Sequence, residues 1–328
     1  MGVYLITGGA GFIGSNFISL LLEKEKDAAV INLDKLTYAG DISRTAFVQG
    51  SRLYKFIHGD ICDKHAVNKV FEEYKPDYVV NFAAETHVDR SISGSEAFMR
   101  TNVLGTHVLL QSSLEHGVKR FLQVSTDEVY GATDIDADLK ETAVLTPGNP
   151  YAASKAAGDM IALAYHNTFQ FPALITRSSN NFGYRQHNEK LIPMVIEKCL
   201  HGEEIPIYGN GLQIRDWIYV EDNCSAIYSA LKRGMEGQIY NISGDNKIDN
   251  ISLVRQIIGI ARDMLPVGDH RKSIINDCLI SFVEDRKGHD SCYSISAEKI
   301  KAQLGWSAKY NFKEALEHTV KLYMEYIG

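Results

Sequence analysis

Cysteine is scarce in this chain, with 5 residues among 328, and no two of them have the spacing of a metal or redox motif. Scattered cysteines in an odd number indicate reduced thiols and a cytoplasmic location. The 11 histidines also lack the spacing of a zinc site, so we expect no bound metal.

Excess positive charge and long apolar runs are missing too. Lysine and arginine number 34 against 41 aspartates and glutamates, and the net charge of −7 argues against a broad nucleic-acid-binding surface. No apolar run approaches the roughly 18 residues of a membrane span. The first residues lack the basic segment of a signal peptide. We therefore expect neither a nucleic-acid nor a membrane partner.

Short runs rich in β-branched and aromatic residues alternate with helical patterns through the first half of the chain. This order is typical of a parallel sheet covered by helices. The expected strands are residues 3–7, 29–33, 54–58, 78–82, 120–125 and 173–177, and the expected helices are 13–24, 64–74, 99–116 and 151–168. Beyond Phe171 the pattern is less regular, with a polar loop predicted over 180–189.

A glycine-rich turn joins the first expected strand to the first expected helix. Gly8 permits a tight turn, Gly11 lets the backbone approach a pyrophosphate, and Gly14 allows close packing of helix on strand. Asp34 follows the second strand, where a carboxylate binds ribose hydroxyls and repels a 2′-phosphate, so NAD is favoured over NADP. Strand-end residues Asp60, Ile61, Ala83 and Ala84 are further candidates for cofactor contact.

These observations predict an α/β protein with a Rossmann-type, doubly wound parallel sheet. We expect residues 1–180 to form the NAD-binding domain, with a later contribution from about 218–245. Residues 181–328 are expected to form a smaller, mixed α/β C-terminal lobe that binds the substrate.

Tyr151 and Lys155 are separated by one helical turn, and a second group of polar residues, Thr126-Asp127-Glu128, ends the fifth strand. An ammonium group beside a phenol lowers its pKa from about 10, which makes Tyr151 usable as a base for alcohol oxidation. A simple dehydrogenase needs only this couple. The adjacent carboxylates predict a longer reaction with an additional acid and an additional base, provided that their environments separate their pKa values.

Several longer motifs carry a specific resemblance. Asn81–Ile92 (NFAAETHVDRSI), Thr101–Gly105 (TNVLG), Ser125–Gly131 (STDEVYG), Arg215–Asp222 (RDWIYVED) and Arg286–Asp290 (RKGHD) resemble the nucleotide-sugar 4,6-dehydratases of the extended short-chain dehydrogenase/reductase superfamily. The match extends over nearly the whole chain and is closest to the dTDP-glucose 4,6-dehydratase family.

The resemblance implies a role for each catalytic candidate. Tyr151, helped by Lys155, takes the proton of the sugar 4-hydroxyl while hydride leaves C4 for NAD, and Thr126 bonds the 4-oxygen. Glu128 removes the C5 proton, Asp127 protonates the leaving 6-hydroxyl, and hydride returns to C6. Further implied cofactor contacts are Phe12, Ile13, Lys35, Thr37, Thr101 and Asn181.

A nucleoside diphosphate hexose is the implied substrate. The resemblance places Arg215 and His289 at the pyrophosphate, and Thr86 and Asn180 at the hexose. The base region is implied to contain Lys190, Leu191, Pro206, Tyr208, Asn250, Asp285 and Arg286. Residues 184–188 (YRQHN) depart from the family pattern of Pro-Tyr-Gln-Phe-Pro, so UDP-N-acetylglucosamine competes with dTDP-glucose as the substrate.

Other readings remain open at this point. A nucleotide-sugar 4-epimerase shares NAD, Tyr151 and Lys155 but needs no extra carboxylates. A nucleotide-sugar decarboxylase or a non-catalytic NAD-binding protein on the same fold is less consistent with the motifs. The expected helices 99–116 and 151–168 carry more apolar surface than one sheet face requires, so we expect a homodimer through this helix pair.

Overall fold

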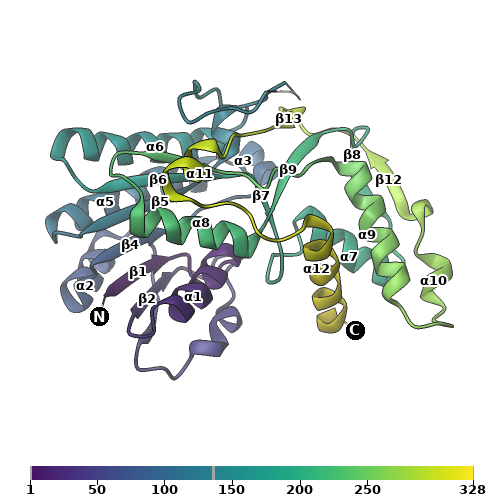
Figure 1. Ribbon diagram of the computed structural model, residues 1–328, viewed down its shortest axis with the longest axis horizontal. Coiled ribbons are helices and arrows are strands. Elements are labelled where there is room, and N and C mark those ends of the chain that lie inside the picture. The colour runs from purple at the N-terminus through teal and green to yellow at the C-terminus, as the bar shows by residue number, and fades with distance from the viewer. Residues whose placement is uncertain (1, 135–136, 328) are drawn as a thin grey trace.

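The computed structural model describes residues 2–134 and 137–327. Its main element is a seven-stranded sheet of order β10-β6-β5-β4-β1-β2-β3, in which all neighbouring strands are parallel (Figure 1). The strands are β1 Val3–Thr7, β2 Ala29–Asp34, β3 Tyr54–His58, β4 Tyr78–Asn81, β5 Arg120–Thr126, β6 Ala173–Ser178 and β10 Ile239–Ile242. The predicted parallel α/β fold is confirmed.

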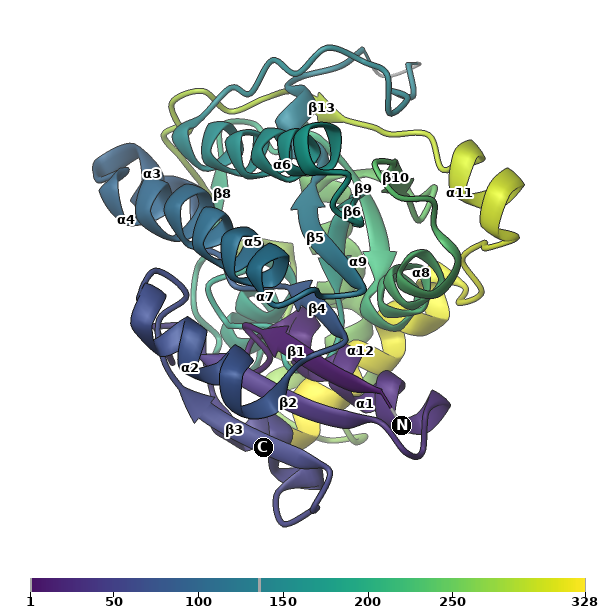
Figure 2. The same ribbon diagram turned by 90° about the vertical axis from the view of Figure 1, so that its left-hand side faces the viewer.

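Alternating side chains of the strands build two separate hydrophobic cores. On β1, Tyr4 and Ile6 belong to one core, whereas Leu5 between them belongs to the other. A strand buried on both faces requires this continuous apolar pattern. Figure 2 shows helices on either side of the sheet: α1 Phe12–Lys24 and α8 Val220–Arg233 on one, and α2 Lys64–Tyr74, α5 Thr106–Glu115 and α6 Pro150–Phe169 on the other.

Two local differences from the sequence expectation lie near the site. The helix expected over 99–116 begins with a π-helical turn at Met99–Gly105, before α5, and follows the short helices α3 Val88–Ser93 and α4 Glu96–Phe98. The stretch expected as a loop after residue 180 begins with a short strand, β7 Asn180–Phe182, which pairs with a strand of the second lobe.

The second lobe combines three long helices with short strands. It contains α7 Leu191–His201, β8 Ile205–Tyr208, β9 Ile214–Tyr219, β11 Lys247–Asp249, α9 Asn250–Met264, α10 Arg271–Ile274, β12 Ile280–Val283, β13 Cys292–Tyr293 and α12 Phe312–Ile327. The chain returns to the first lobe through α8, β10 and α11 Glu298–Leu304, which contacts α8 and β10. No helix in the described part of the chain is long and apolar enough to cross a membrane.

Strand order reverses direction between β1 and β4. In open parallel sheets, ligands bind at the carboxyl ends of the strands beside such a reversal. β1, β4, β5 and β6 all end at this edge, and the second lobe lies next to it (Figure 1). The residues that follow these four strands are therefore the candidates for a ligand-binding site.

Candidate active site

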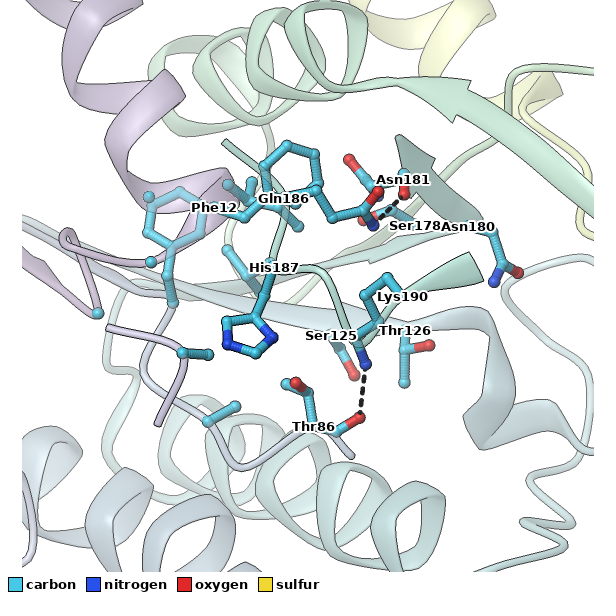
Figure 3. A pocket seen from close by; sticks show the side chains of 18 of the residues that line it. Phe12, Thr86, Ser125, Thr126, Ser178, Asn180, Asn181, Gln186, His187 and Lys190 are labelled. Carbon is cyan, nitrogen blue, oxygen red and sulfur yellow. Dashed lines mark hydrogen bonds between the residues drawn. The ribbon is translucent and has the colours of Figure 1, made fainter. Parts of the chain in front are cut away.

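A cavity of about 280 Å³, the first cavity, lies at the carboxyl ends of the strands and reaches the start of α1 (Figure 3). A second cavity of about 100 Å³ adjoins it on the β2 side and shares Gly8, Gly11 and Ala84 with it. A third cavity of about 450 Å³ extends toward the second lobe and shares Thr86, Glu128 and Lys190 with the first. The three cavities thus form one continuous groove.

The glycines of the first turn are required by close packing. Gly8 has φ +69°, and a Cβ on it would lie 2.6 Å from the backbone nitrogen of Ala83. A Cβ on Gly14 would lie 2.4 Å from the carbonyl oxygen of Gly8. Gly11 is the N-cap of α1 and gives the helix no side-chain cap, which leaves backbone N–H groups directed toward the first cavity. This cradle fits the pyrophosphate of a dinucleotide.

Asp34 ends β2 at the wall of the second cavity. Its carboxylate accepts hydrogen bonds from the backbone N–H of Ala10 (2.9 Å) and of Leu36 (2.8 Å). Burial raises the pKa of Asp34, and these two N–H groups oppose that shift. A carboxylate fixed in this way at the end of the second strand is suited to ribose hydroxyls.

The other predicted cofactor residues lie on the same walls. Lys35 forms an ion pair of 2.7 Å with Asp60, whose other oxygen accepts from the backbone N–H of Cys62 (2.8 Å). Both carboxylate oxygens of Asp60 therefore already have a protein partner. The second cavity also contains Thr37, Ile61, Ala83 and Thr101, and the first contains Phe12, Ile13, Ala84 and Asn181.

Asp127 and Glu128 follow β5 directly, in a 3-10 turn over Asp127–Tyr130 that is capped by Thr126. The Thr126 hydroxyl accepts from the Glu128 backbone N–H (3.2 Å) and donates to Asp127 Oδ1 (3.1 Å). Asp127 is buried, Glu128 is half-buried, and both carboxyl groups line the first cavity. Buried carboxyl groups at a ligand cavity are candidates for acid–base chemistry.

The two carboxyl groups have different electrostatic surroundings. Burial, followed by the charge of Glu128, raises the pKa of Asp127 to about 8. Burial also raises the pKa of Glu128, but Arg215, Asn149 and Lys190 act against this rise. Asp127 is therefore protonated at neutral pH, and the cations and the amide around Glu128 favour its ionised form, as an acid and a base side by side require.

Tyr151 and Lys155 are presented by the first two turns of α6. Asn149 caps this helix by accepting from the Ala152 N–H (2.8 Å), and Pro150 occupies its first position. Lys155 Nζ donates to the carbonyl oxygen of Val124 on β5 (2.7 Å), which fixes the helix against the strand. Both side chains line the first cavity beside Asp127 and Glu128.

The expectation that Lys155 lowers the pKa of Tyr151 is wrong when only the groups of the protein itself are considered. Burial and then the charge of Glu128 raise the pKa of Tyr151 well above its ordinary value, and only Thr126 opposes them through a hydrogen bond. Lys155 is not among the groups that act on the Tyr151 phenol, because its ammonium group is directed to the Val124 carbonyl oxygen instead. A cationic ligand beside Tyr151 would supply the missing positive charge.

The third cavity brings together most of the predicted substrate residues. Arg215, on β9, is buried; it donates to the Asp290 carbonyl (3.0 Å) and lies over the Tyr293 ring at 4.4 Å. The other predicted residues on this wall are Thr86, Asn180, Lys190, Leu191, Pro206, Tyr208, Asn250, Arg286 and His289. Lys190 reaches the Thr86 carbonyl oxygen (3.3 Å; Figure 3), so it lies where the first and third cavities meet.

Asp285 is the exception among the predicted substrate residues. It lies outside the cavity wall, and its carboxylate instead accepts from Gln213 (3.2 Å) and pairs with His289 Nδ1 (2.6 Å). The acidic neighbour orients the His289 ring, whose pKa is lowered chiefly by burial. Asp285 therefore acts on the cavity through His289.

The cavity walls also contain residues that were not predicted from the sequence. Tyr293 lies on the third cavity three residues after the RKGHD motif and donates to Asp290 (2.5 Å), so extending that motif could have found it. Asn149, which donates to Glu128 Oε2 (3.3 Å), could have been found as the cap of the Tyr151 helix. His187 and Asp89 line the first and third cavities, respectively; both lie in stretches that carry a signal, His187 in the divergent segment 184–188 and Asp89 in the motif 81–92.

The parallel sheet, the glycine turn and the Tyr151–Lys155 couple define a member of the extended short-chain dehydrogenase/reductase superfamily. Residues 5–319 match the family model described as GDP-mannose 4,6 dehydratase, and the chain belongs to this family of nucleotide-sugar 4,6-dehydratases.

Known proteins agree with this assignment. The chain is 43% identical to the dTDP-glucose 4,6-dehydratase of Xanthomonas campestris pv. campestris (strain B100), over 99% of this chain and 93% of that protein. It is 42% identical, with a TM-score of 0.91, to the crystal structure of the dTDP-glucose 4,6-dehydratase DesIV from Streptomyces venezuelae with NAD and dTDP bound, covering 98% and 97% of the two chains.

Epimerases share the same fold. The UDP-glucose 4-epimerase of Thermotoga maritima has a TM-score of 0.88 to this chain but only 27% identity, with 99% and 100% of the two chains covered. Because the fold is common to both activities, the distinction between them rests on the residues of the site.

Proposed function

We propose that the protein is an NAD-dependent 4,6-dehydratase that converts a nucleoside diphosphate hexose, dTDP-glucose, into its 4-keto-6-deoxy derivative and water. The observation that carries the proposal is a pair of adjacent carboxyl groups in one cavity with Tyr151: the buried Asp127, whose pKa is raised to about 8, and Glu128, which Arg215 and Lys190 surround. The dTDP-glucose 4,6-dehydratases at 42–43% identity support the choice of substrate.

NAD would take hydride from C4 of the sugar and return it to C6. The glycine turn would hold its pyrophosphate, and Asp34 the adenosine ribose. Tyr151 accepts the proton of the 4-hydroxyl, and the hydroxyl of Thr126 is close enough to bond the same oxygen. The positive charge of an oxidised nicotinamide next to Tyr151 would lower its pKa when this proton is taken.

The two carboxyl groups perform the elimination. A 4-ketone acidifies the C5 hydrogen; the Glu128 carboxylate removes it as a proton and gives a proton back to C5 when hydride adds to C6. Asp127 gives its proton to the 6-hydroxyl, which leaves as water. One Asp127 oxygen, Oδ2, has no hydrogen-bond partner among the described residues, so it is available to the substrate. Arg215 and Lys190 favour the ionised form of Glu128 before the substrate reacts.

A nucleotide-sugar 4-epimerase would leave this pair without a function. Epimerisation returns hydride to C4 and breaks neither the C5–H bond nor the C6–O bond, so it needs no second acid and base. Burying two adjacent carboxyl groups is costly. The presence of Asp127 and Glu128 in the cavity therefore favours dehydration.

Product analysis tests the proposal directly. The purified protein is incubated separately with dTDP-glucose, UDP-glucose and UDP-N-acetylglucosamine, and products are analysed by mass spectrometry and NMR. We expect loss of one water and a 4-keto-6-deoxy product with dTDP-glucose. Dehydration of UDP-N-acetylglucosamine alone would change the substrate, and inversion at C4 without loss of mass would show an epimerase.

We also propose a homodimer through the helix pair formed by the segment 99–115 and α6. Large apolar side chains of this pair are exposed, including Leu104 and Met160, each 44% exposed. Light scattering should give twice the chain mass for the wild type and one chain mass for a Leu104→Glu, Met160→Glu variant. A monomeric wild type would contradict the proposal.

We also propose that the protein is located in the cytoplasm. All five cysteines are free thiols, and disulfides are rare in the reducing cytoplasm. Cell fractionation followed by immunodetection tests this location, and recovery of the protein outside the cytoplasmic fraction would contradict it.

A further inference from the structure

The segment after β7 reaches from the second lobe over the glycine turn. It is the same segment, residues 184–188, that departs from the family pattern. Arg185 takes φ +74° there, and its guanidinium lies near the Ser15 carbonyl oxygen (3.5 Å) at the start of α1. Asn16 of α1 donates to the Tyr184 carbonyl (3.3 Å). The segment is therefore held against the helix that presents the anion-binding N–H groups.

His187 is the residue of this segment whose ring enters the groove. Figure 3 shows the ring between the Phe12 and Thr86 sides of the cavity. It lines the first cavity together with Gly11, Phe12 and Gly14, but it is not part of the wall of the third cavity. Its neighbours Gln186, Glu189 and Lys190 line both. His187 thus lines the cavity that contains the glycine turn and is absent from the wall of the cavity in the second lobe.

Hydrogen bonding decides which ring nitrogen is available. The backbone N–H of Glu189 donates to Nδ1 of His187 (3.3 Å), so the neutral ring carries its hydrogen on Nε2. The edge-on contact with Tyr38, at 5.6 Å between ring centroids, holds the ring in this orientation. Nε2 is accordingly a hydrogen-bond donor on a ring that lines the same cavity as Gly8, Gly11 and Gly14.

The charges around His187 are mainly positive. Arg44 of the 3-10 helix Ile42–Val48, Lys190 of its own segment and Arg90 of α3 all disfavour a second proton on the ring, and burial does so most. Glu189 is the opposing charge, 3.8 Å from Nδ1. An arginine, a lysine and an imidazole around the start of a helix form a setting for a dianion.

We propose that His187 donates from Nε2 to the pyrophosphate of the bound dinucleotide and closes the anion site opposite the glycine turn. This inference rests on the proposed use of NAD. Two phosphates beside the ring favour its protonated form, so binding is accompanied by proton uptake. The dinucleotide is then held more tightly at pH 6 than at pH 8, through a residue that the family pattern replaces with phenylalanine.

Equilibrium dialysis of the full chain with three ligands tests the proposal. NAD and ADP-ribose both contain the pyrophosphate, whereas AMP lacks it. His187→Phe is expected to raise the Kd of NAD and of ADP-ribose about tenfold at pH 6 and about threefold at pH 8, and to leave the Kd of AMP unchanged. His187→Gln keeps a donor without a charge, so its Kd should be intermediate and independent of pH.

The control is His65→Gln, which removes an exposed histidine near the start of α2, outside the three cavities. It should bind all three ligands like the wild type. Equal Kd values for wild type and His187→Phe would overturn the proposal, and so would a loss confined to NAD, which would indicate contact with the nicotinamide half. Failure of the wild type to bind NAD at all would instead refute the proposed function.

Discussion

Replacing Asp127 by asparagine should stabilise the folded protein at neutral pH while it abolishes the elimination step. Asparagine has nearly the shape of aspartic acid and is always neutral. It cannot give a proton to the 6-hydroxyl, so the dehydration should stop. The same change removes the free-energy cost of burying an acid whose pKa is far from its ordinary value.

The magnitude follows from the pKa. Burial and the charge of Glu128 raise the pKa of Asp127 from 3.8 to about 8. At pH 7 the folded protein must therefore bind a proton that the unfolded chain does not bind, which costs about 4 kcal/mol. The asparagine amide brings N–H donors to a position where Oδ2 has no partner among the described residues, which costs about 2 kcal/mol. The net stabilisation at pH 7 is about 2 kcal/mol.

The sign of the pH dependence is determined by the direction of the shift. Because the folded pKa lies above the unfolded one, the cost to the wild type is absent below pH 3.8, increases as the pH rises, and levels off near pH 8. Asp127→Asn should thus be less stable than the wild type at pH 4 and more stable at pH 7 and 8. Calorimetric unfolding of both proteins at four pH values measures this difference. A difference that does not change with pH would refute the reasoning.

Three further substitutions test other parts of the site. Glu128→Gln should still form NADH from the substrate but lower turnover about 10²- to 10⁴-fold, and normal turnover would rule out Glu128 as the C5 base. Gly14→Ala places a methyl group 2.4 Å from the Gly8 oxygen, so dialysis should show loss of NAD binding, whereas Gly259→Ala, which meets no atom within 4 Å, is the matched control. Arg177→Met leaves the buried Asp159 without its partner at 2.9 Å, and urea unfolding should show a loss of about 3–5 kcal/mol, partly recovered with Asp159→Asn. No recovery would contradict the ion-pair explanation.

The sequence was sufficient for most of the sheet because its signals are local. β1, β3 and helix α2 have the predicted bounds, since each is an apolar run or helical pattern bordered by turn residues. β7 was missed because its three residues pair only with β9, more than thirty residues later in the chain. The π-helical turn was missed because its periodicity differs little from that of the helix it interrupts.

The positions of the site residues could also be predicted, since Thr126, Asp127 and Glu128 end a parallel strand and Tyr151 and Lys155 share a helical face. The protonation states of these residues could not be predicted from the sequence. The pKa of Tyr151 depends on how deeply α6 is buried and on the partner of Lys155, a backbone carbonyl of β5. No side-chain pattern in the sequence identifies that carbonyl.

The division of labour between Asp127 and Glu128 shows the same dependence on distant residues. Adjacent in sequence, they would titrate alike in water. In the fold, Glu128 is influenced by Arg215, Lys190 and Arg286 from the second lobe, and Asn149 donates to its carboxylate. Asp127 faces the carboxylates of Glu128 and Asp216, and Arg215 affects it more weakly. A change that moves the second lobe away from β5 should therefore reduce the difference between the two pKa values, so the lobe that we propose to bind the substrate also determines which carboxyl group is the acid.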